Sequence, residues 1–286
     1  MACWECPPPK STDYKRKECF NVTAFLQVEV NEGIALVTLN SPATRNVLGF
    51  DGPSAEIAQA CERISADRSI RAVVLTGTGT AFSAGGDIRN MAARLDNAQL
   101  EPIDDRYYYK EGIHRIPKAL YDLEVPTIAA VNGPAIGAGL DLACMCDIRI
   151  AARTATFAES FVTLGIIPGD GGAFLLQRLV GAAKAAEMTF TGEAITAEQA
   201  LACGLVSQVV ANEELVETAM GLARRIAKNP SHALRMAKRL MRESQHLRLE
   251  TVLELSSAFQ ALAHASSDHR ERVTRAVQAI DRRKNS

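Results

Sequence analysis

The sequence has no apolar run long enough to cross a bilayer, and it carries almost no net charge. Its 286 residues include 32 Lys and Arg against 33 Asp and Glu, so the formal charge is −1. A charge so close to zero creates no overall field that would attract nucleic acid or an acidic membrane. The opening residues MACWECPPPKSTDYKRKE lack the apolar core of a signal peptide and contain acidic residues, unlike a transit peptide. We therefore expect a soluble, cytoplasmic protein with a flexible N-terminal extension over residues 1–21.

Several common motifs of catalysis and metal binding are also missing. The cysteines are odd in number and scattered, at positions 3, 6, 19, 61, 144, 146 and 203. Cys3 and Cys6 form a CxxC without a second pair or a His at zinc-finger spacing, so we expect free thiols and no bound metal. Ser83 lies in AFSAG rather than GxSxG, and GAGLDL lacks the last Gly of GxGxxG, which argues against a serine hydrolase and a dinucleotide site. We expect surface positions for the histidines His114, His232, His246, His264 and His269.

Alternating strands and helices dominate the first two thirds of the chain. LQVEVNEGIALVTLN contains two alternating patterns around an Asn-Glu-Gly turn, and residues 52–67 have helical spacing. RAVVLT (71–76) and TIAAV (127–131) are continuously apolar, as strands buried on both faces are, and 148–151 resembles them. Thr196 and Gln199 form a capping box before a helix that Gly204 ends. This alternation predicts an α/β fold with a largely parallel sheet.

From residue 213 onward only helical spacing remains, and its apolar stripes need either the α/β core or another subunit as a partner. This region is rich in basic residues: Arg224, Arg225, Lys228, Arg235, Lys238, Arg239 and Arg242. Solvated faces of amphipathic helices explain such residues better than RNA recognition does.

One arrangement occurs twice in the α/β part. The strand RAVVLT leads through GTGTAFSAGG to Asp87 and a helix, and TIAAV leads through NGPAIGAG to Asp141 and another helix. Small residues let another group approach the backbone, and the start of a helix leaves N–H groups without partners. If the two junctions faced each other they would form an oxyanion hole, although ordinary α/β proteins also use Gly at such turns.

Four linked motifs then point to a family. AFSAGGDI, NGPAIGAGLDLACMCDIRIA, LGIIPGDGG and AEQALACGLVSQVV follow one another in an order that resembles the crotonase family, the enoyl-CoA hydratases and isomerases, from about residue 22. The resemblance implies a crotonase-like spiral of ββα units over 22–212, a C-terminal helical trimerisation region over 213–286, and a homotrimer or hexamer. It also implies an acyl-CoA substrate, with coenzyme A as part of that substrate and no further cofactor.

The resemblance assigns site residues by motif position. The backbone N–H groups of Gly86 and Ala138 would polarise the thioester carbonyl, where fixed donors stabilise the charge of an enolate. Positions that match the family's CoA site are Thr44, Arg45, Ala84, Asp87 and Ile88.

The acidic residues depart from the usual hydratase pattern. Asp141 matches one of the two catalytic carboxylates, where glutamate is usual, and the second position is Phe161, which cannot activate water. Glu159 is a candidate substitute, because in an extended segment it would face the same side as Phe161, but a solvated glutamate is favoured there. Asp170 in PGDGG is either a third catalytic acid or a helix N-cap. Because one carboxylate can take and return a proton, the pattern favours double-bond isomerisation over hydration, with Asp141 moving the proton and Asp170 assisting or replacing it. The alternative is a catalytically weak crotonase-fold protein that binds a CoA ester or RNA.

Overall fold

A computed structural model describes residues 18–22, 25–49, 52–97 and 99–284. The strands are β1 (Glu18–Val22), β2 (Leu26–Asn31), β3 (Ile34–Leu39), β4 (Ala72–Gly77), β5 (Thr127–Val131), β6 (Ala135–Ile136), β7 (Ile148–Ala152), β8 (Thr156–Ala158), β9 (Ile195–Thr196) and β10 (Gln208–Val210). The α-helices are α1 (Pro53–Ala66), α2 (Ile88–Leu95), α3 (Pro102–Glu111), α4 (Arg115–Asp122), α5 (Ala138–Cys144), α6 (Gly172–Val180), α7 (Ala182–Thr191), α8 (Ala197–Ala202), α9 (Leu215–Ala227), α10 (Ser231–Glu243), α11 (Leu249–His264) and α12 (Ser267–Lys284). The 3₁₀ helices are η1 (Pro42–Thr44), η2 (Ser160–Leu164) and η3 (Asn212–Glu214).

The central sheet has the order β1-β2-β3-β4-β5-β7-β10 and is parallel from β3 onward, with β1 and β2 antiparallel at one edge. A smaller sheet has the order β6-β8-β9. Glu32 and Gly33 turn between β2 and β3 with φ of 52° and 77°, and such left-handed turns match the twist of a hairpin. The predicted α/β fold with a largely parallel sheet is confirmed.

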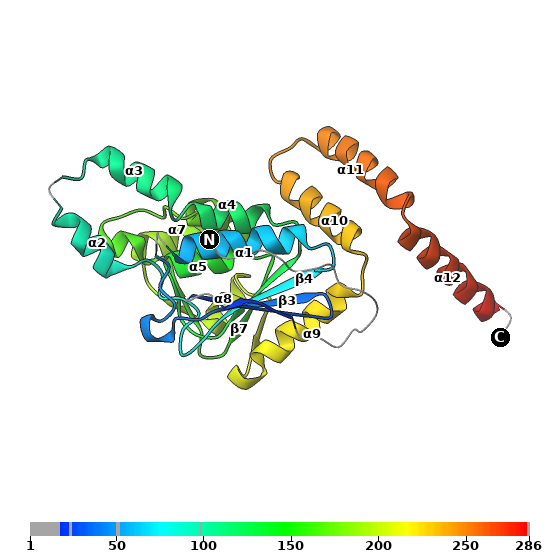
Figure 1. Ribbon diagram of the computed structural model, residues 1–286, viewed down its shortest axis with the longest axis horizontal. Helices are drawn as coiled ribbons and strands as arrows, with labels where there is room; N and C mark the ends of the chain where they lie inside the picture. Colours follow the sequence, from blue (N-terminus) through cyan, green and yellow to red (C-terminus); the bar gives the residue numbers. More distant parts are fainter. Residues whose placement is uncertain (1–17, 23–24, 50–51, 98, 285–286) are drawn as a thin grey trace, which may run out of the picture.

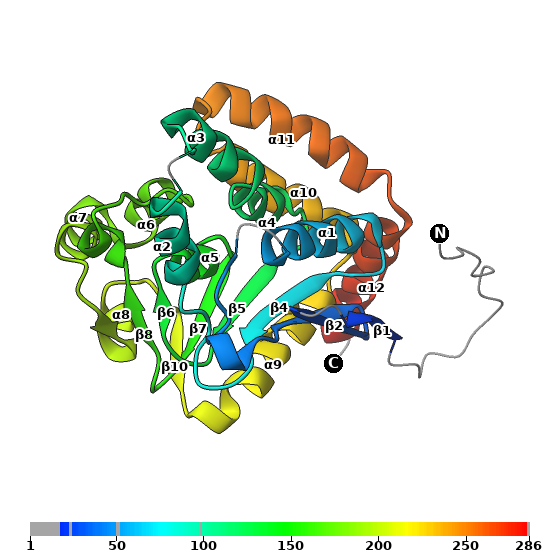
Figure 2. The ribbon, with the colours of Figure 1, turned by 60° about the vertical axis from the view of Figure 1, so that its left-hand side comes forward.

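The two faces of the sheet contact different layers. Along β4, Val73 and Leu75 join the larger core, while Ala72 and Val74 join a second core that α9 completes. This alternation explains why RAVVLT is apolar throughout, because successive side chains point to opposite faces and both faces are buried. Figure 2 shows α9 against one face and α1, α4 and α5 over the other.

The limit of the predicted N-terminal extension differs in the structure, and the first helix of the predicted C-terminal region takes the α/β core as its partner surface. Residues 18–22 form β1, which pairs antiparallel with β2, so the last part of the predicted flexible extension belongs to the sheet. Pairing with the free edge of β2 satisfies backbone groups that an extension would leave to water. Residues 1–17, with Cys3 and Cys6, lie outside the described residues. The helix α9, which falls in the predicted C-terminal region, buries Ala219 and Ala223 against the sheet.

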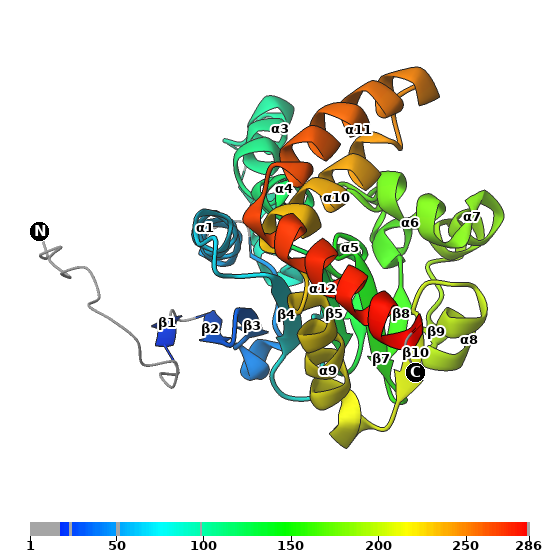
Figure 3. The ribbon, with the colours of Figure 1, turned by 90° about the vertical axis from the view of Figure 1, so that its right-hand side faces the viewer.

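Among the described residues, the last two helices have no buried side chain. They extend from the body in Figure 1, and α12 passes in front of the body in Figure 3. They expose large apolar side chains, namely Leu249, Leu253, Leu262, Val273, Val277 and Ile280. Among the described residues, no helix is long and apolar enough to cross a membrane.

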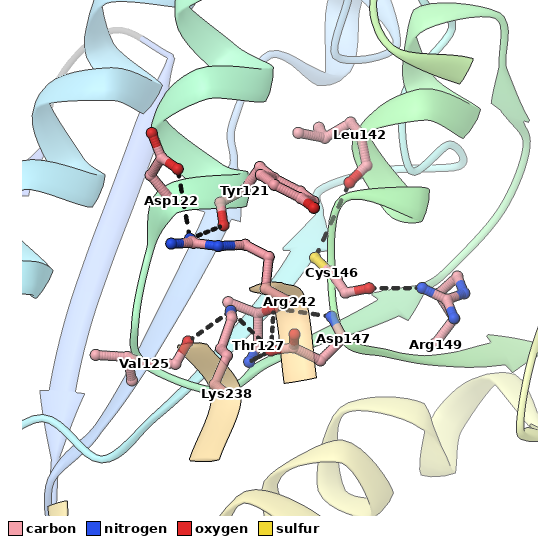
Figure 4. Close-up of polar contacts among 10 residues, drawn as sticks. All are labelled: Tyr121, Asp122, Val125, Thr127, Leu142, Cys146, Asp147, Arg149, Lys238 and Arg242. Carbon is pink, nitrogen blue, oxygen red and sulfur yellow. Dashed lines mark hydrogen bonds and ion pairs between the residues drawn. The ribbon is translucent and has the colours of Figure 1, made fainter. Parts of the chain in front are cut away.

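Basic residues of α10 attach this helix to the core. Figure 4 shows Lys238, whose Nζ lies 2.8 Å from Oδ2 of Asp147, and Arg242, whose Nη1 donates to the carbonyl oxygen of Tyr121 at 2.7 Å. Arg235 is 5% exposed and donates to carbonyl oxygens at the end of α1. Three of the basic residues in the tail therefore have structural partners within the chain.

Candidate active site

The two strand-to-helix junctions lie side by side. The N–H of Ile136 donates to the carbonyl oxygen of Ser83 at 3.1 Å, and the N–H of Ser83 donates to that of Pro134 at 3.1 Å. The backbones are so close that a Cβ on Gly85 would lie 2.3 Å from the Ile136 oxygen, and one on Gly139 would lie 2.4 Å from the Ser83 oxygen. Only glycine fits at these two positions, which explains the Gly-rich turns of both motifs.

Gly86 and Ala138 bring their backbones to one cavity, which both residues line. Ala138 is the first residue of α5 and follows Gly137, whose φ of 50° turns the chain into the helix. The N–H of a first-turn residue has no acceptor within its own helix. No acceptor among the described residues receives a hydrogen bond from the N–H of Gly86 or Ala138. The two donors are therefore available to a ligand.

The cavity contains about 560 Å³ of empty space when the open solvent at its mouth is counted. Its walls come from the two junctions, from α2 and α3, from η2 and from the turn before α6. The described lining residues are Leu48, Ala84, Gly86, Ile88, Met91, Tyr109, Ile113, Ile136, Gly137, Ala138, Ser160, Phe161, Leu164, Ile166 and Asp170. Among these, Asp170 is the one with an acidic side chain. Phe161 packs its ring against Gly137, where an added Cβ would lie 3.6 Å away.

Asp170 is 6% exposed and stands at the wall of this cavity. Burial raises the pKa of its carboxyl to about 6. The N-cap residue of α6 is Gly171, so the expected alternative, in which Asp170 caps this helix, does not describe the structure. A carboxyl with a pKa near neutrality can both accept and release a proton under physiological conditions.

Asp141 lies deeper than Asp170. Its side chain is fully buried and does not line the cavity, and its Oδ2 accepts a hydrogen bond of 2.9 Å from the N–H of Gly172 in α6. Burial, followed by the charge of Glu159, raises the pKa of Asp141 well above its usual range.

Glu159 is also fully buried, so the expectation of a solvated glutamate is wrong. The chain does not stay extended after β8 but turns into η2, and Glu159 at this turn lies beneath α6 rather than beside Phe161 on one face. A Cβ on Gly172 would lie 2.2 Å from Oε1 of Glu159 and 2.3 Å from Oδ1 of Asp141. Burial raises the pKa of Glu159 to about 7.

The residues that match the family's CoA site fall into two groups. Ala84 and Ile88 line the cavity, and Ile88 is 59% exposed at its mouth. Thr44 and Arg45 are exposed on the neighbouring turn, where the Arg45 carbonyl accepts a 2.9 Å hydrogen bond from the N–H of Ala84. The carboxylate of Asp87 accepts from two N–H groups of α2 at 3.0 Å and so caps that helix.

From the sequence, Tyr109 of the site was missed and its neighbour His114 was misjudged. Tyr109 of α3 lines the cavity, and burial together with the nearby Asp170 raises the pKa of its phenol. His114 is partly buried, with Nε2 lying 2.9 Å from the carbonyl oxygen of Gly169, so its expected surface role is wrong. The helical spacing of Tyr109 and Ile113, which line the cavity together, is the signal that could have indicated this wall.

Comparison with known proteins shows which family the chain resembles. Residues 29–284 match the family model described as enoyl-CoA hydratase/isomerase. The chain is 37% identical to the 1,2-epoxyphenylacetyl-CoA isomerase of Escherichia coli, over 87% of this chain and 94% of that protein. It is 36% identical to the 2,3-dehydroadipyl-CoA hydratase of the same organism, over 88% and 95%.

A solved structure of an enoyl-CoA hydratase from Bacillus anthracis superposes with a TM-score of 0.81 at 31% identity, covering 91% of this chain and 96% of that one. The family match and the solved structure show that the chain has the crotonase fold that the sequence motifs predict. The chain belongs to the enoyl-CoA hydratase/isomerase family and is an enzyme that acts on acyl-CoA.

Proposed function

We propose that the protein moves the double bond of an enoyl-CoA thioester through an enolate held by the N–H groups of Gly86 and Ala138. One observation carries this proposal: Gly86, Ala138, Asp170 and Phe161 all line a single cavity. By motif position, Phe161 takes the place of the second carboxylate of the family's hydratases. The two N–H groups bind the thioester oxygen, so that the charge left by removing a proton from C2 moves onto that oxygen. Returning the proton at C4 converts a 3-enoyl thioester into the 2-enoyl isomer.

Asp170 is the group that carries this proton. Its carboxylate is present at neutral pH because its pKa is about 6, and its wall position gives it access to the acyl chain. The sequence favoured Asp141 for this step, and that role stays a prediction. The burial of Asp141 beneath the cavity supports Asp170 as the residue in contact with the substrate.

Phe161 favours isomerisation over hydration. Addition of water needs a group that activates the water and one that protonates carbon, and a phenyl ring does neither. The relatives include a named isomerase and a named hydratase at nearly equal identity, so their names do not choose between the two reactions.

The acyl group that fits best is apolar. Leu48, Met91, Ile113 and Phe161 line the same cavity as Asp170, and aromatic side chains favour a flat apolar partner. Because one relative is named 1,2-epoxyphenylacetyl-CoA isomerase, aromatic thioesters belong among the substrates to test. Thr44, Arg45 and Asp87 complete the proposed CoA site beside Ala84 and Ile88.

A homo-oligomer, a trimer or hexamer, is part of the proposal. The helices α11 and α12 have no buried side chain in the single chain, and their exposed leucines and valines need a partner surface. Sedimentation velocity of the full chain measures this directly, and a monomer at micromolar concentration would contradict it. A cytoplasmic location stays a prediction.

The competing proposal is that the protein binds CoA esters or RNA without efficient catalysis. An RNA-binding role is weakened because Arg235, Lys238 and Arg242 already have partners within the chain. Tight binding of CoA esters with no turnover of any of them would support the binding protein instead.

The test is an assay series on the parent, Asp170→Asn and Asp141→Asn. The substrates are crotonyl-CoA, a 3-enoyl-CoA, and longer and aromatic enoyl-CoA thioesters. We expect the 3-enoyl thioester to be isomerised, with a loss of about 10²-fold or more in Asp170→Asn. Unchanged rates in Asp170→Asn would exclude Asp170 as the proton carrier.

A further inference from the structure

Two fully buried carboxyls, Asp141 and Glu159, form a pair beneath the cavity. Neither lines the cavity, yet both approach Gly172, the first residue of α6. Apart from the N–H of Gly172, no donor outside the pair, among the described residues, bonds to these carboxyls. The two side chains lie close enough to hydrogen-bond to each other when one of them is protonated. Unpaired carboxylates are costly to bury, whereas two adjacent carboxyls that share a proton satisfy each other.

The surroundings supply no counter-charge. The titratable or charged groups around the pair are Cys144 of α5, Arg149 of β7, Asp170 before α6, and Tyr109 and His114 beyond Asp170. Arg149 donates instead to the carbonyl oxygens of Cys146 and Leu205, at 2.6 Å each. On α7, Lys184 and Glu187 pair with each other at 2.9 Å on the surface. No Lys or Arg in the described part of the chain forms an ion pair with either carboxyl, so protons must neutralise them.

The pair lies next to both parts of the proposed site: the helix that begins at Ala138 and the turn that contains Asp170. Asp141 lies in the same short helix as Ala138, which lines the cavity. Its bond to Gly172 fixes the first turn of α6, directly after Asp170. A negative charge placed here opposes both the enolate charge at Ala138 and the ionisation of Asp170, whereas a neutral pair opposes neither.

We propose that Asp141 and Glu159 are positioning residues, which hold α6 against α5 and keep the site active only while both retain their protons. This inference rests on the proposed function, because it assigns the pair's effect to the enolate held at Ala138. Loss of the Glu159 proton gives the pair one negative charge, while Asp141 keeps its own proton and donates it to the Glu159 carboxylate.

The expected pH profile is a narrow bell. Activity rises as Asp170 ionises, with a pKa of about 6, and falls as Glu159 ionises, with a pKa of about 7. Because the three carboxyls interact, each limb belongs to the cluster rather than to one residue. Replacing Glu159 by glutamine removes the group responsible for the falling limb and keeps a side chain of the same shape.

The first experiment measures kcat/KM of the full chain on a 3-enoyl-CoA across pH, for the parent and for Glu159→Gln. We expect Glu159→Gln to keep the rising limb and to reach a plateau where the parent declines. If Glu159→Gln lowers the rate by the same factor at every pH, the role of Glu159 is purely structural and the proposal is wrong. A parent profile without a falling limb would also overturn the proposal.

The second experiment needs no turnover and so separates this inference from the proposed function. Infrared difference spectra of the parent and Asp141→Asn at about pH 8 report the C=O stretch of a protonated carboxyl, which ordinary carboxyls have lost at that pH. We expect this band in the parent and its loss in Asp141→Asn. A parent without the band would overturn the shared proton, whatever the activity; inactivity of the parent with the band present would refute only the proposed function.

Discussion

The N–H of Gly172 lies 2.9 Å from Oδ2 of Asp141, so the first turn of α6 is bonded to the middle of α5. This contact places α6 directly over two buried carboxyls, and it leaves no space at Gly172 for a side chain. The helix that follows Asp170 is thus held by the residue that the family pattern marks as catalytic.

Gly172→Ala tests this close approach. The added Cβ would lie 2.2 Å from Oε1 of Glu159, so the helix or the carboxyls must move, and we expect a loss of about 1–3 kcal/mol in the free energy of unfolding. Gly221→Ala in α9 is the matched control: nothing lies within 4 Å of its added Cβ, and alanine favours the helix by about 0.5–1 kcal/mol. Equal effects of the two variants in urea unfolding would contradict the packing described.

The buried carboxyl of Asp170 makes stability depend on pH. Its folded-state pKa of about 6 lies above the unfolded value of about 4, so the folded state binds the proton more tightly. The stabilisation is complete below about pH 4 and is lost as pH rises through about 6. Asp170→Asn should therefore gain on the order of 2 kcal/mol relative to the parent between about pH 4 and 8. A stability difference that does not change with pH would contradict the raised pKa.

Phe161→Glu tests the proposal that hydration is slow because the cavity lacks a second carboxyl. It places a carboxyl in the cavity with Asp170, and we expect hydration of crotonyl-CoA to rise by about 10²-fold over the parent, measured by the loss of enoyl absorbance. The buried acid should also lower the free energy of unfolding by about 1–3 kcal/mol. Phe161→Leu removes the same ring without adding an acid, so a similar gain in that variant would assign the effect to space rather than to the carboxyl.

Arg235→Leu tests the attachment of α10. The Arg235 side chain is 6% exposed and donates to the carbonyl oxygens of Ser65 at 3.1 Å and Asp67 at 3.0 Å. Its loss removes both of these hydrogen bonds, although the Asp67 oxygen still accepts from the N–H of Ile70 at 3.3 Å. We expect a cost of about 2–3 kcal/mol in thermal or urea unfolding. Arg239 of the same helix also approaches Glu124, but it is 51% exposed, and Arg239→Leu should cost less than about 1 kcal/mol. The opposite order of the two costs would contradict this role.

The sequence predicted the sheet well because its signals are local. Continuous apolar runs marked β4 and β5, and the capping box of Thr196 and Gln199 marked α8, whose hydrogen bonds the structure confirms. The position of α9 could not be predicted in the same way, because an apolar stripe shows that a partner surface exists but not which one.

The site was harder to predict because a sequence motif does not show how deeply each side chain is buried. Asp141 and Asp170 both matched plausible acids, and only the packing of α6 over α5 shows which one lines the cavity. Glu159 was misjudged because an extended segment was expected where η2 turns the chain. Tyr109 comes from a helix that none of the four motifs includes.

The ratio of the isomerisation rate to the hydration rate tests the central claim most directly. The parent enzyme is given a 3-enoyl-CoA and crotonyl-CoA in parallel under the same conditions, and initial rates of isomerisation and hydration are compared. With Asp170 as the one acid at the cavity wall among the described residues and Phe161 in place of the second, isomerisation should be at least about 10²-fold faster. Hydration of crotonyl-CoA as fast as isomerisation would contradict the account.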